Sequence, residues 1–358
     1  MSVHFHSLKV SNIARETEES VIITFNVPAG LQQLFQFTQG QTLTIKKNID
    51  GEDIRRSYSI CSAPFENKLS IAIKKVDGGK FSCYANTLLQ RGDVLDVLPP
   101  TGGFYTPLNN TNQKRYLAFA AGSGITPVLS IIKTTLMIET GSTFTLVYGN
   151  KSRSSIMFFE ALEALKNKYL QRFNFINILS RERTEAPISQ GRINEEKLTE
   201  LQRLVDYKSM DEIFICGPGE MIFCVKTYLE KMDIEPEKIH FELFTTPGSN
   251  RVETKPAPQV ENGGTKSSVT IRLDGRSFDF SLAFNSDSIL DAALKQGADL
   301  PYACKGGVCS TCRAKLLEGE VRMDVNYALG PAELENGFIL TCQSHPISEK
   351  IVVDFDSV

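Results

Sequence analysis

The sequence of 358 residues has no run of about 18 apolar residues, so it contains no segment able to span a membrane as a helix. Its first residues, MSVHFHSLKV, lack the basic and apolar regions of a signal peptide. We therefore expect a cytoplasmic protein that makes no contact with a membrane. Thiols stay reduced in the cytoplasm, so structural disulfides are not expected either.

The sequence also lacks basic runs and internal repeats. With a net charge of −3 and no basic cluster, it is not expected to bind nucleic acid. Its four histidines are expected to be structural or surface residues, because their spacing does not suit a metal site: His4, His6, His240 and His345. Residues 269–358 carry 8 basic and 13 acidic side chains, against 31 and 29 in the remainder. This acidic segment either steers a docking partner or serves solubility.

The length suits two or three domains. Residues 246–268 are rich in Pro, Gly, Ser and charge, which predicts a flexible linker. Residues 1–110 predict an antiparallel β-barrel built from the strands VIITFNV, TLTIKK, RRSYSIC, LSIAIKKV and DVLDVLPP. Residues 111–245 alternate apolar strands with helices, which predicts an α/β domain with a doubly wound parallel sheet. Residues 269–358 predict an α+β domain of strands around one helix.

Three of the eight cysteines lie within nine residues, in PYACKGGVCSTC at 301–312. Cys304, Cys309 and Cys312 follow the C-x4-C-x2-C pattern, and Cys342 follows after 29 intervening residues. This is the spacing of a plant-type [2Fe–2S] site, in which two irons need four thiolates and a glycine-rich loop curls around them. A zinc site is the main alternative, although zinc ligands usually form two C-x2-C pairs. A disulfide network is the other.

A second motif, RRSYS at 55–59, lies on a predicted strand. Arg56 and Tyr58 are two residues apart and therefore point to the same face. An arginine suits a diphosphate, a tyrosine ring stacks on a flat heterocycle, and Ser59 can bond a ring nitrogen. Further along, GGKFSCYANTLL opens a predicted helix whose N-terminus would bind a pyrophosphate. The alternative is an ordinary strand followed by an ordinary helix.

A third motif is the glycine turn AAGSGITPVLSII at 120–132, which leaves a strand and opens a helix as a dinucleotide site requires. Pro127 stands where the third glycine of G-x-G-x-x-G would be. A further element, Cys216-Gly217-Pro218-Gly219, ends a later strand. The remaining cysteines, Cys61, Cys83 and Cys224, are expected to be small hydrophobic core residues.

These motifs carry resemblances. LPYACKGGVCSTC and LTCQ resemble plant-type ferredoxins, which implies a β-grasp-type domain whose cluster is held by Cys304, Cys309, Cys312 and Cys342. RSYS, GKFS, GSGITP and CGP resemble the ferredoxin–NADP reductase superfamily, which implies a barrel that binds FAD, or less often FMN. The flavin-binding residues that this implies are Arg56, Ser57, Tyr58, Ser59, Ile73, Lys74, Lys75, Gly79, Lys80, Phe81 and Ser82. Those implied for NADPH or NADH are Gly122, Gly124, Thr126, Pro127, Arg153, Ser180, Arg181, Cys216, Gly217 and Pro218. Tyr58, Ser59 and Cys216 would be the catalytic residues, placed beside the reacting rings.

The domain order resembles the reductase components of multicomponent oxygenases. Among these, VCSTCRAKLLEGEVRMDVNYAL is most similar to the reductase subunits of phenylacetyl-CoA epoxidase systems. The resemblance implies an enzyme that passes electrons from NAD(P)H through FAD and a [2Fe–2S] cluster to an oxygenase partner. Two alternatives stay open: an FMN-type reductase of another aromatic-ring or steroid oxygenase, and an electron carrier without enzymatic activity. The intact GSGITP and CGPG motifs argue against the second.

The choice of coenzyme depends on the end of the predicted strand FNFINILS. In dinucleotide folds an acidic residue there bonds the ribose 2′-OH, whereas an arginine accommodates a 2′-phosphate. Here Ser180 is followed by Arg181 and then by Glu182, and Arg153 after the preceding strand offers a second positive charge. We therefore expect NADPH rather than NADH. The alternative is that both arginines are solvated loop residues.

Overall fold

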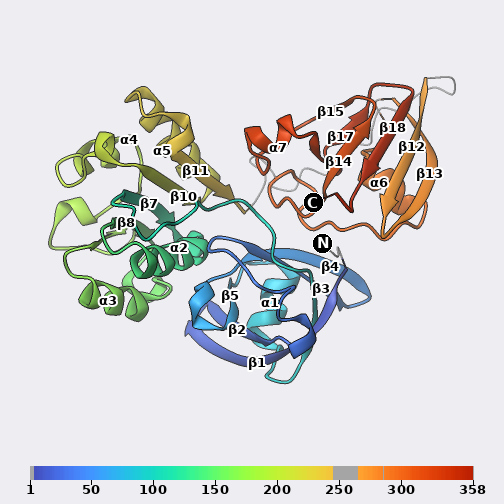
Figure 1. The fold of residues 1–358 in the computed structure, drawn as a ribbon. Coiled ribbons are helices and arrows are strands. Elements are labelled where there is room, and N and C mark those ends of the chain that lie inside the picture. Colours follow the sequence, from blue (N-terminus) through green and yellow to red (C-terminus); the bar gives the residue numbers. More distant parts are fainter. Residues whose placement is uncertain (1–3, 245–264, 285, 358) are drawn as a thin grey trace.

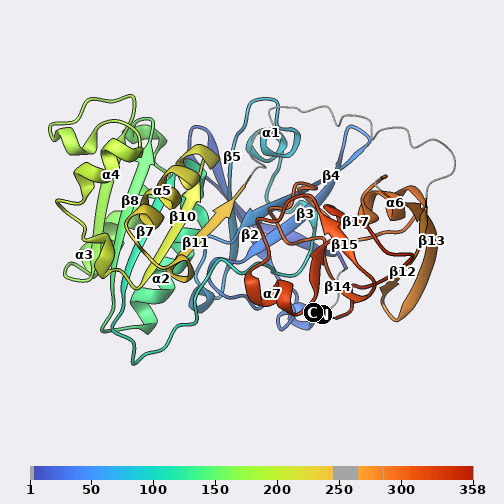
Figure 2. The same cartoon turned by 90° about the horizontal axis from the view of Figure 1, so that it is seen from above.

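The computed structural model of this chain describes residues 4–244, 265–284 and 286–357, which fold as three domains (Figures 1 and 2). Most of the predicted linker at 246–268 lies outside the described residues. The multidomain class predicted from the sequence is confirmed: an antiparallel domain, a parallel α/β domain and a C-terminal α+β domain follow one another. No helix in the described part of the chain is long and apolar enough to cross a membrane.

The N-terminal domain is a six-stranded antiparallel sheet in the order β4-β3-β6-β1-β2-β5. Its elements are β1 (His6–Thr17), β2 (Ser20–Asn26), β3 (Thr42–Ile49), β4 (Glu52–Ser59), β5 (Leu69–Lys74), α1 (Lys80–Thr87) and β6 (Val94–Val97). An isolated bridge between Ile60 and Ile71 joins the two edges of the sheet, which closes it as a barrel. Alternating apolar residues fill the interior, and Phe81 of α1 is buried in the same core.

The second domain is a parallel sheet in the order β11-β10-β7-β8-β9 with helices on both faces (Figure 1). Its elements are β7 (Arg115–Ala121), α2 (Ile125–Ile138), β8 (Thr143–Asn150), α3 (Phe159–Lys168), β9 (Phe173–Leu179), α4 (Glu195–Leu201), β10 (Glu212–Gly217), α5 (Gly219–Lys231) and β11 (Ile239–Leu243). Strand residues alternate between two apolar cores, so that Ala118 packs on one face and Phe119 on the other. The strand order reverses between β7 and β10, where such folds bind their ligands.

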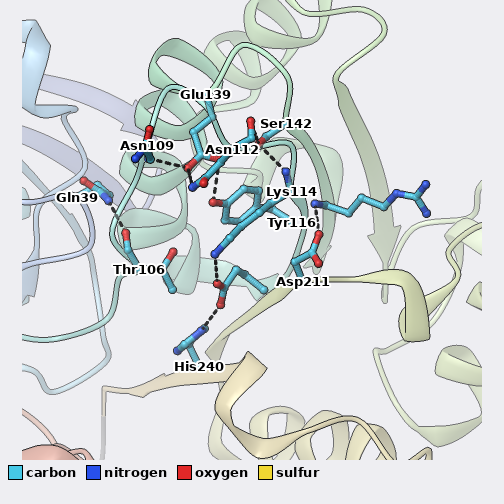
Figure 3. A network of polar contacts seen from close by, with 12 residues as sticks. Gln39, Thr106, Asn109, Asn112, Lys114, Tyr116, Glu139, Ser142, Asp211 and His240 are labelled. Atoms are coloured by element: carbon cyan, nitrogen blue, oxygen red, sulfur yellow. Dashed lines mark hydrogen bonds and ion pairs between the residues drawn. The ribbon is translucent and has the colours of Figure 1, made fainter.

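A buried polar network supports the α/β domain at the junction with the barrel (Figure 3). Glu139 is fully buried, and its carboxyl oxygens accept hydrogen bonds from Tyr116 Oη at 2.9 Å and Asn112 Nδ2 at 2.6 Å. Ser142 Oγ and the Asn109 N–H donate two more, at 2.7 and 3.1 Å. Every polar atom of this buried carboxyl group therefore has a partner, which makes its enclosure in the core tolerable.

The C-terminal domain has the sheet order β13-β12-β18-β14-β16, with β12 and β18 parallel and the other pairs antiparallel. Its elements are β12 (Lys266–Leu273), β13 (Arg276–Ala283), α6 (Ile289–Lys295), β14 (Arg313–Glu318), β15 (Val321–Met323), α7 (Pro331–Glu335), β16 (Phe338–Leu340), β17 (Ser344–Pro346) and β18 (Lys350–Asp354). Helix α6 packs its apolar residues against this sheet, as the β-grasp expectation requires. The cysteine loop lies between α6 and β14.

The cysteine loop of the C-terminal domain touches both other domains. Thr311 contacts Thr44 of β3 across 2.9 Å, between side-chain oxygens. On the other side, Val308 belongs to the same apolar cluster as Ile222 and Val225 of α5, and the ring of Tyr327 meets Phe223 at 6.3 Å between centroids. The loop is therefore held at the point where all three domains come together.

Candidate functional site

A cavity of about 1010 Å³ lies between the barrel and the α/β domain. The barrel contributes β4, the end of β5 and the start of α1, and the α/β domain contributes the segments that follow β7, β8, β9 and β10. Its walls include Arg56, Ser57, Tyr58, Ser59, Lys74, Gly79, Lys80, Phe81, Ser82, Gly122, Ser123, Thr126, Lys151, Ser180, Arg181, Arg192, Gly217, Pro218 and Phe244. Most of the residues singled out in the sequence are thus brought together at one site.

Strand β4 forms the barrel wall of the cavity. Its regular pairing with β3 places Arg56 and Tyr58 on the same face, as the spacing predicts. Tyr58 packs at 5.7 Å between ring centroids against Phe81, and burial raises the pKa of its hydroxyl, which stays neutral. The exposed Arg56 donates to its neighbour's carbonyl and, among the residues described, its other N–H groups meet no acceptor, so they can bind an anion.

Helix α1 presents its N-terminus at the other end of this wall. Gly79 is the N-cap and no described side chain caps the helix, so its first N–H groups are available to a ligand. Ser82 instead accepts a hydrogen bond from the Val76 N–H at 3.2 Å, which fixes the preceding turn. Lys74 faces the same space, where burial and the positive charge of Lys151 lower its pKa, although Glu19 opposes the shift. Two cations that repel each other across a cavity favour an anionic ligand between them.

Two of the predicted flavin residues lie elsewhere. Ile73 is fully buried in the barrel core, and neither its side chain nor that of Lys75 lines the cavity. Both are neighbours of Lys74, and alternation along the end of β5 turns their side chains away from the face that Lys74 uses. The structure therefore places neither Ile73 nor Lys75 at the cavity wall, and their predicted contact with the flavin is not supported.

The glycine turn follows β7 at the point where the strand order reverses. Gly122 has a φ of +54° and opens a 3₁₀ turn that leads into α2. Gly122, Ser123 and Thr126 line the cavity, whereas Gly124 and Pro127 lie behind them in the core. A Cβ on Gly124 would lie 2.1 Å from the carbonyl oxygen of Cys216, so this glycine is needed for close packing against β10.

Cys216 itself does not reach the cavity. Its side chain is fully buried in the apolar cluster between the sheet and α2, while Gly217 and Pro218 form the cavity wall. Burial and the nearby Glu242 raise the pKa of the thiol well above its ordinary value, so it is held neutral. The sequence placed Cys216 among the catalytic residues; the structure places it one layer behind the surface because side chains alternate along β10.

Glu242 of β11 is a site residue that no sequence pattern marked. Ser59 Oγ donates a 3.1 Å hydrogen bond to its Oε2, which joins the barrel motif to the last strand of the α/β domain. Burial, helped by the nearby Cys309, raises the pKa of this carboxyl to about 8, in spite of the bond from Ser59. The alternating strand FEL around it gave no sign that its acidic residue would be enclosed between domains.

The coenzyme end of the cavity is basic. Ser180 and Arg181 line it as predicted, but Arg153 does not, because its guanidinium lies 5.0 Å above the ring of Phe159. The backbone N–H of Arg153 donates to Glu182 Oε2 at 2.7 Å, which draws that carboxylate away from the cavity. The positive charges beside Arg181 come instead from Lys151 and Arg192. Lys151 lies just after β8, as Arg181 lies just after β9. Its position at a strand end could therefore have marked it as a coenzyme-binding residue in the sequence.

The four cysteines of the C-terminal domain form two pairs. Cys304 is hydrogen-bonded to Cys309, and Cys312 to Cys342. The bond from Cys304 lowers the pKa of Cys309, and the bond from Cys312 lowers that of Cys342. Across the described residues, no three potential ligands converge on a single metal position. Two thiols for each of two metals fit a two-iron cluster and do not fit a tetrahedral zinc site.

The loop backbone is shaped around these sulfurs. Positive φ angles occur at Lys305, Gly307 and Ser310, and a Cβ on Gly307 would lie 3.0 Å from the Val325 carbonyl oxygen. The Gly306 N–H donates to Cys304 Sγ at 3.3 Å. Such N–H groups offset the negative charge of a thiolate-bound cluster. None of the eight cysteines, all of which lie in the described part of the chain, forms a disulfide bond.

A barrel wall for a flavin, a glycine turn for a dinucleotide and a loop for two irons define a class of protein, the pyridine-nucleotide-dependent iron–sulfur flavoprotein reductases. Family sequence profiles agree: residues 7–117 match the oxidoreductase FAD-binding domain, 119–227 the oxidoreductase NAD-binding domain and 271–346 the 2Fe-2S iron-sulfur cluster binding domain.

Comparison with whole proteins is more specific. The chain is 47% identical to a subunit of the 1,2-phenylacetyl-CoA epoxidase of Escherichia coli K12, over 99% of this chain and 98% of that protein. It is 32% identical to the ferredoxin reductase component of 3-ketosteroid-9-alpha-monooxygenase from Rhodococcus rhodochrous, over 97% of this chain and 96% of that protein. The chain therefore belongs to the family of reductase components of multicomponent oxygenases.

Solved structures share the fold. Phthalate dioxygenase reductase superposes with a TM-score of 0.59 at 23% identity, over 98% of both chains. An intact type IV self-sufficient cytochrome P450 monooxygenase gives a TM-score of 0.70 at 20% identity, over 98% of this chain and 41% of that one. At such identities the likeness concerns the arrangement of the three domains alone.

Proposed function

We propose that this chain is the reductase of a phenylacetyl-CoA epoxidase system, and that it draws electrons from NADPH. The observation that carries the proposal is a single cavity that combines the RSYS strand, the glycine turn and a basic end. Beside this cavity lies the cysteine loop, whose thiols form two pairs with the help of Cys342. The choice of partner is supported by the 47% identity to a phenylacetyl-CoA epoxidase protein.

The residues have separate tasks in this proposal. Arg56, Lys74 and the N-terminus of α1 bind the diphosphate of FAD, and Tyr58 packs against its ring. Gly122, Ser123 and Thr126 hold the coenzyme diphosphate, while Gly217 and Pro218 support the nicotinamide. The four cysteines hold the cluster. When bound, the flavin supplies the conversion of a hydride into two single electrons, and the cluster passes these on one at a time.

The preference for NADPH rests on charge. Lys151, Arg181 and Arg192 line the end of the cavity that the strand ends β8 and β9 form, and Glu182 is turned toward the Arg153 N–H. A 2′-phosphate would meet three cations there, whereas no acidic side chain among the described lining residues of this end is placed to bond a 2′-OH. We also propose a cytoplasmic location, which suits a protein whose cysteines are all unpaired.

Reconstitution tests the proposal. The purified protein is analysed for released flavin, iron and sulfide, and is then combined with the oxygenase component, phenylacetyl-CoA, oxygen and NADPH. We expect FAD, two irons per chain and substrate loss that requires both proteins. A 3-ketosteroid oxygenase component serves as the control partner. If the protein reduces an artificial acceptor but supports the control oxygenase equally well, the assignment of the partner is wrong and the reductase activity stands.

A further inference from the structure

Arg55, the first arginine of RRSYS, has no part in the site described so far. It lies between Ile54 and Arg56 on β4, so its side chain leaves the strand on the face opposite to Arg56 and Tyr58. Only 7% of this side chain is exposed, which is unusual for an arginine. A buried guanidinium needs partners for its N–H groups, and those partners identify its role.

The partners of Arg55 belong mainly to the C-terminal domain. Its Nη1 donates to the Leu300 carbonyl oxygen at 3.1 Å, and its Nη2 to Asp299 Oδ1 at 3.2 Å. The guanidinium also lies 4.3 Å from the ring centroid of Tyr302. Asp53, on the same strand, orients it at 2.9 Å. One arginine of the barrel therefore binds the segment that leads directly into Cys304, by an ion pair, a backbone bond and a cation–π contact.

A cluster of three hydroxyl groups makes the second contact. Thr44 of β3 and Ser57 of β4 are opposite each other in the sheet and 3.0 Å apart between oxygens. Thr311, which stands between Cys309 and Cys312, reaches both, at 2.9 Å from Thr44 and 3.3 Å from Ser57. Thr44 and Thr311 are almost fully buried. Ser57 also lines the large cavity, so this one residue touches the cysteine loop and the proposed flavin site.

We propose that Arg55, Thr44, Ser57 and Thr311 are positioning residues that lock the cysteine loop onto β4, so that flavin and cluster face each other across a single strand. The inference rests on the proposed function. Contacts between domains are weak and mobile by default, so specific contacts are needed to keep a domain in one position. The rate of electron transfer falls steeply with distance. The contacts that hold the cysteine loop on β4 therefore set the rate of electron transfer from the flavin to the cluster.

The test uses the full-length, cofactor-loaded protein with Arg55→Gln, Thr311→Val, the conservative Thr311→Ser, and Arg91→Gln as a matched control. Arg91 is an exposed arginine of the barrel outside this interface. Hydrogen–deuterium exchange of the peptide 298–312 reports docking. Anaerobic mixing with NADPH separates flavin bleaching from cluster bleaching. Redox titration gives the potentials of both groups, and iron analysis confirms that the cluster is present.

We expect exchange of the 298–312 peptide to rise about tenfold in Arg55→Gln and in Thr311→Val, equivalent to about 1.4 kcal/mol of lost docking energy. Cluster bleaching should slow in both, while flavin bleaching and both potentials stay at wild-type values. Thr311→Ser and Arg91→Gln should match the wild type. Unchanged exchange and unchanged cluster bleaching would overturn the inference, as would slower bleaching explained by a shifted cluster potential. Failure of flavin bleaching in the wild type would instead refute the proposed function.

Discussion

Replacing Arg181 with alanine should lower the preference for NADPH over NADH. Arg181 lines the basic end of the cavity with Lys151 and Arg192, and it is exposed. A charge-assisted hydrogen bond contributes about 1.5–3 kcal/mol, whereas an exposed ion pair contributes about 0.2–1 kcal/mol. Because Arg181 is exposed and shares the phosphate with two other cations, we expect a loss of about 1–1.4 kcal/mol, or about five- to tenfold in kcat/KM for NADPH.

The assay compares kcat/KM for NADPH and NADH in the wild type and in Arg181→Ala, with an artificial acceptor. NADH lacks the 2′-phosphate, so its kcat/KM should change little. Arg183→Ala is the matched control, since Arg183 is also exposed and does not line the cavity. Lys151→Ala should act like Arg181→Ala, and Arg153→Ala should act like the control because that guanidinium lies over Phe159.

Ionic strength provides a second check on this reasoning. The Debye length falls from about 8 Å at physiological salt to about 3 Å at 1 M, so the difference between wild type and Arg181→Ala should shrink as salt is added. A wild-type enzyme that prefers NADH would refute the proposed role of the basic end of the cavity. So would a coenzyme ratio that neither Arg181→Ala nor Lys151→Ala changes.

Three further predictions concern binding and stability. Arg56→Ala should raise the dissociation constant for FAD by about 10- to 150-fold in equilibrium dialysis, because it removes a charge-assisted bond of about 1.5–3 kcal/mol. The exposed control Lys68→Ala should keep the wild-type dissociation constant, and the same result for Arg56→Ala would contradict the prediction. Burial raises the pKa of Glu242 to about 8, so the free energy of unfolding should fall as the pH rises from about 4.5 to 8. Glu242→Gln should remove about 1–3 kcal/mol of this fall. The prediction is wrong if wild type and Glu242→Gln lose the same stability between pH 5 and pH 8. Glu139→Gln replaces two accepting oxygens with one, so it should destabilise the α/β domain by about 2–4 kcal/mol in denaturant titrations, and a loss below about 0.5 kcal/mol would show that the buried network is not needed.

Local motifs were predictable from the sequence because their chemistry is local. The two-residue spacing of Arg56 and Tyr58 fixes a shared face wherever the strand lies, and the glycines of the turn after β7 meet a local need for positive φ and close approach. The strand β1 was missed. It is polar at alternate positions, and a bulge between Val10 and Asn12 shifts its apolar pattern, so that its sequence HSLKVSNIARET does not read as a strand.

Contacts between distant segments were beyond the reach of sequence patterns. Arg55 meets Leu300, 245 positions away, and Ser59 meets Glu242, 183 positions away. Neither pair has a spacing that marks it. The burial of Cys216 depends on which face of β10 turns toward α2, and the diversion of Arg153 depends on where α3 places Phe159. These outcomes are set by the packing of domains and helices, which no single segment encodes.

In the proposed function, one chain carries electrons from a pyridine nucleotide through a flavin to a cluster held by Cys304, Cys309, Cys312 and Cys342. The most direct test is anaerobic addition of NADPH to the wild type and to Cys309→Ser, followed by visible and electron paramagnetic resonance spectroscopy. We expect that both proteins lose flavin absorbance and that only the wild type develops the signal of a reduced two-iron cluster. A wild type whose flavin is reduced while no such signal forms, or a Cys309→Ser variant that gives the wild-type signal, would contradict it.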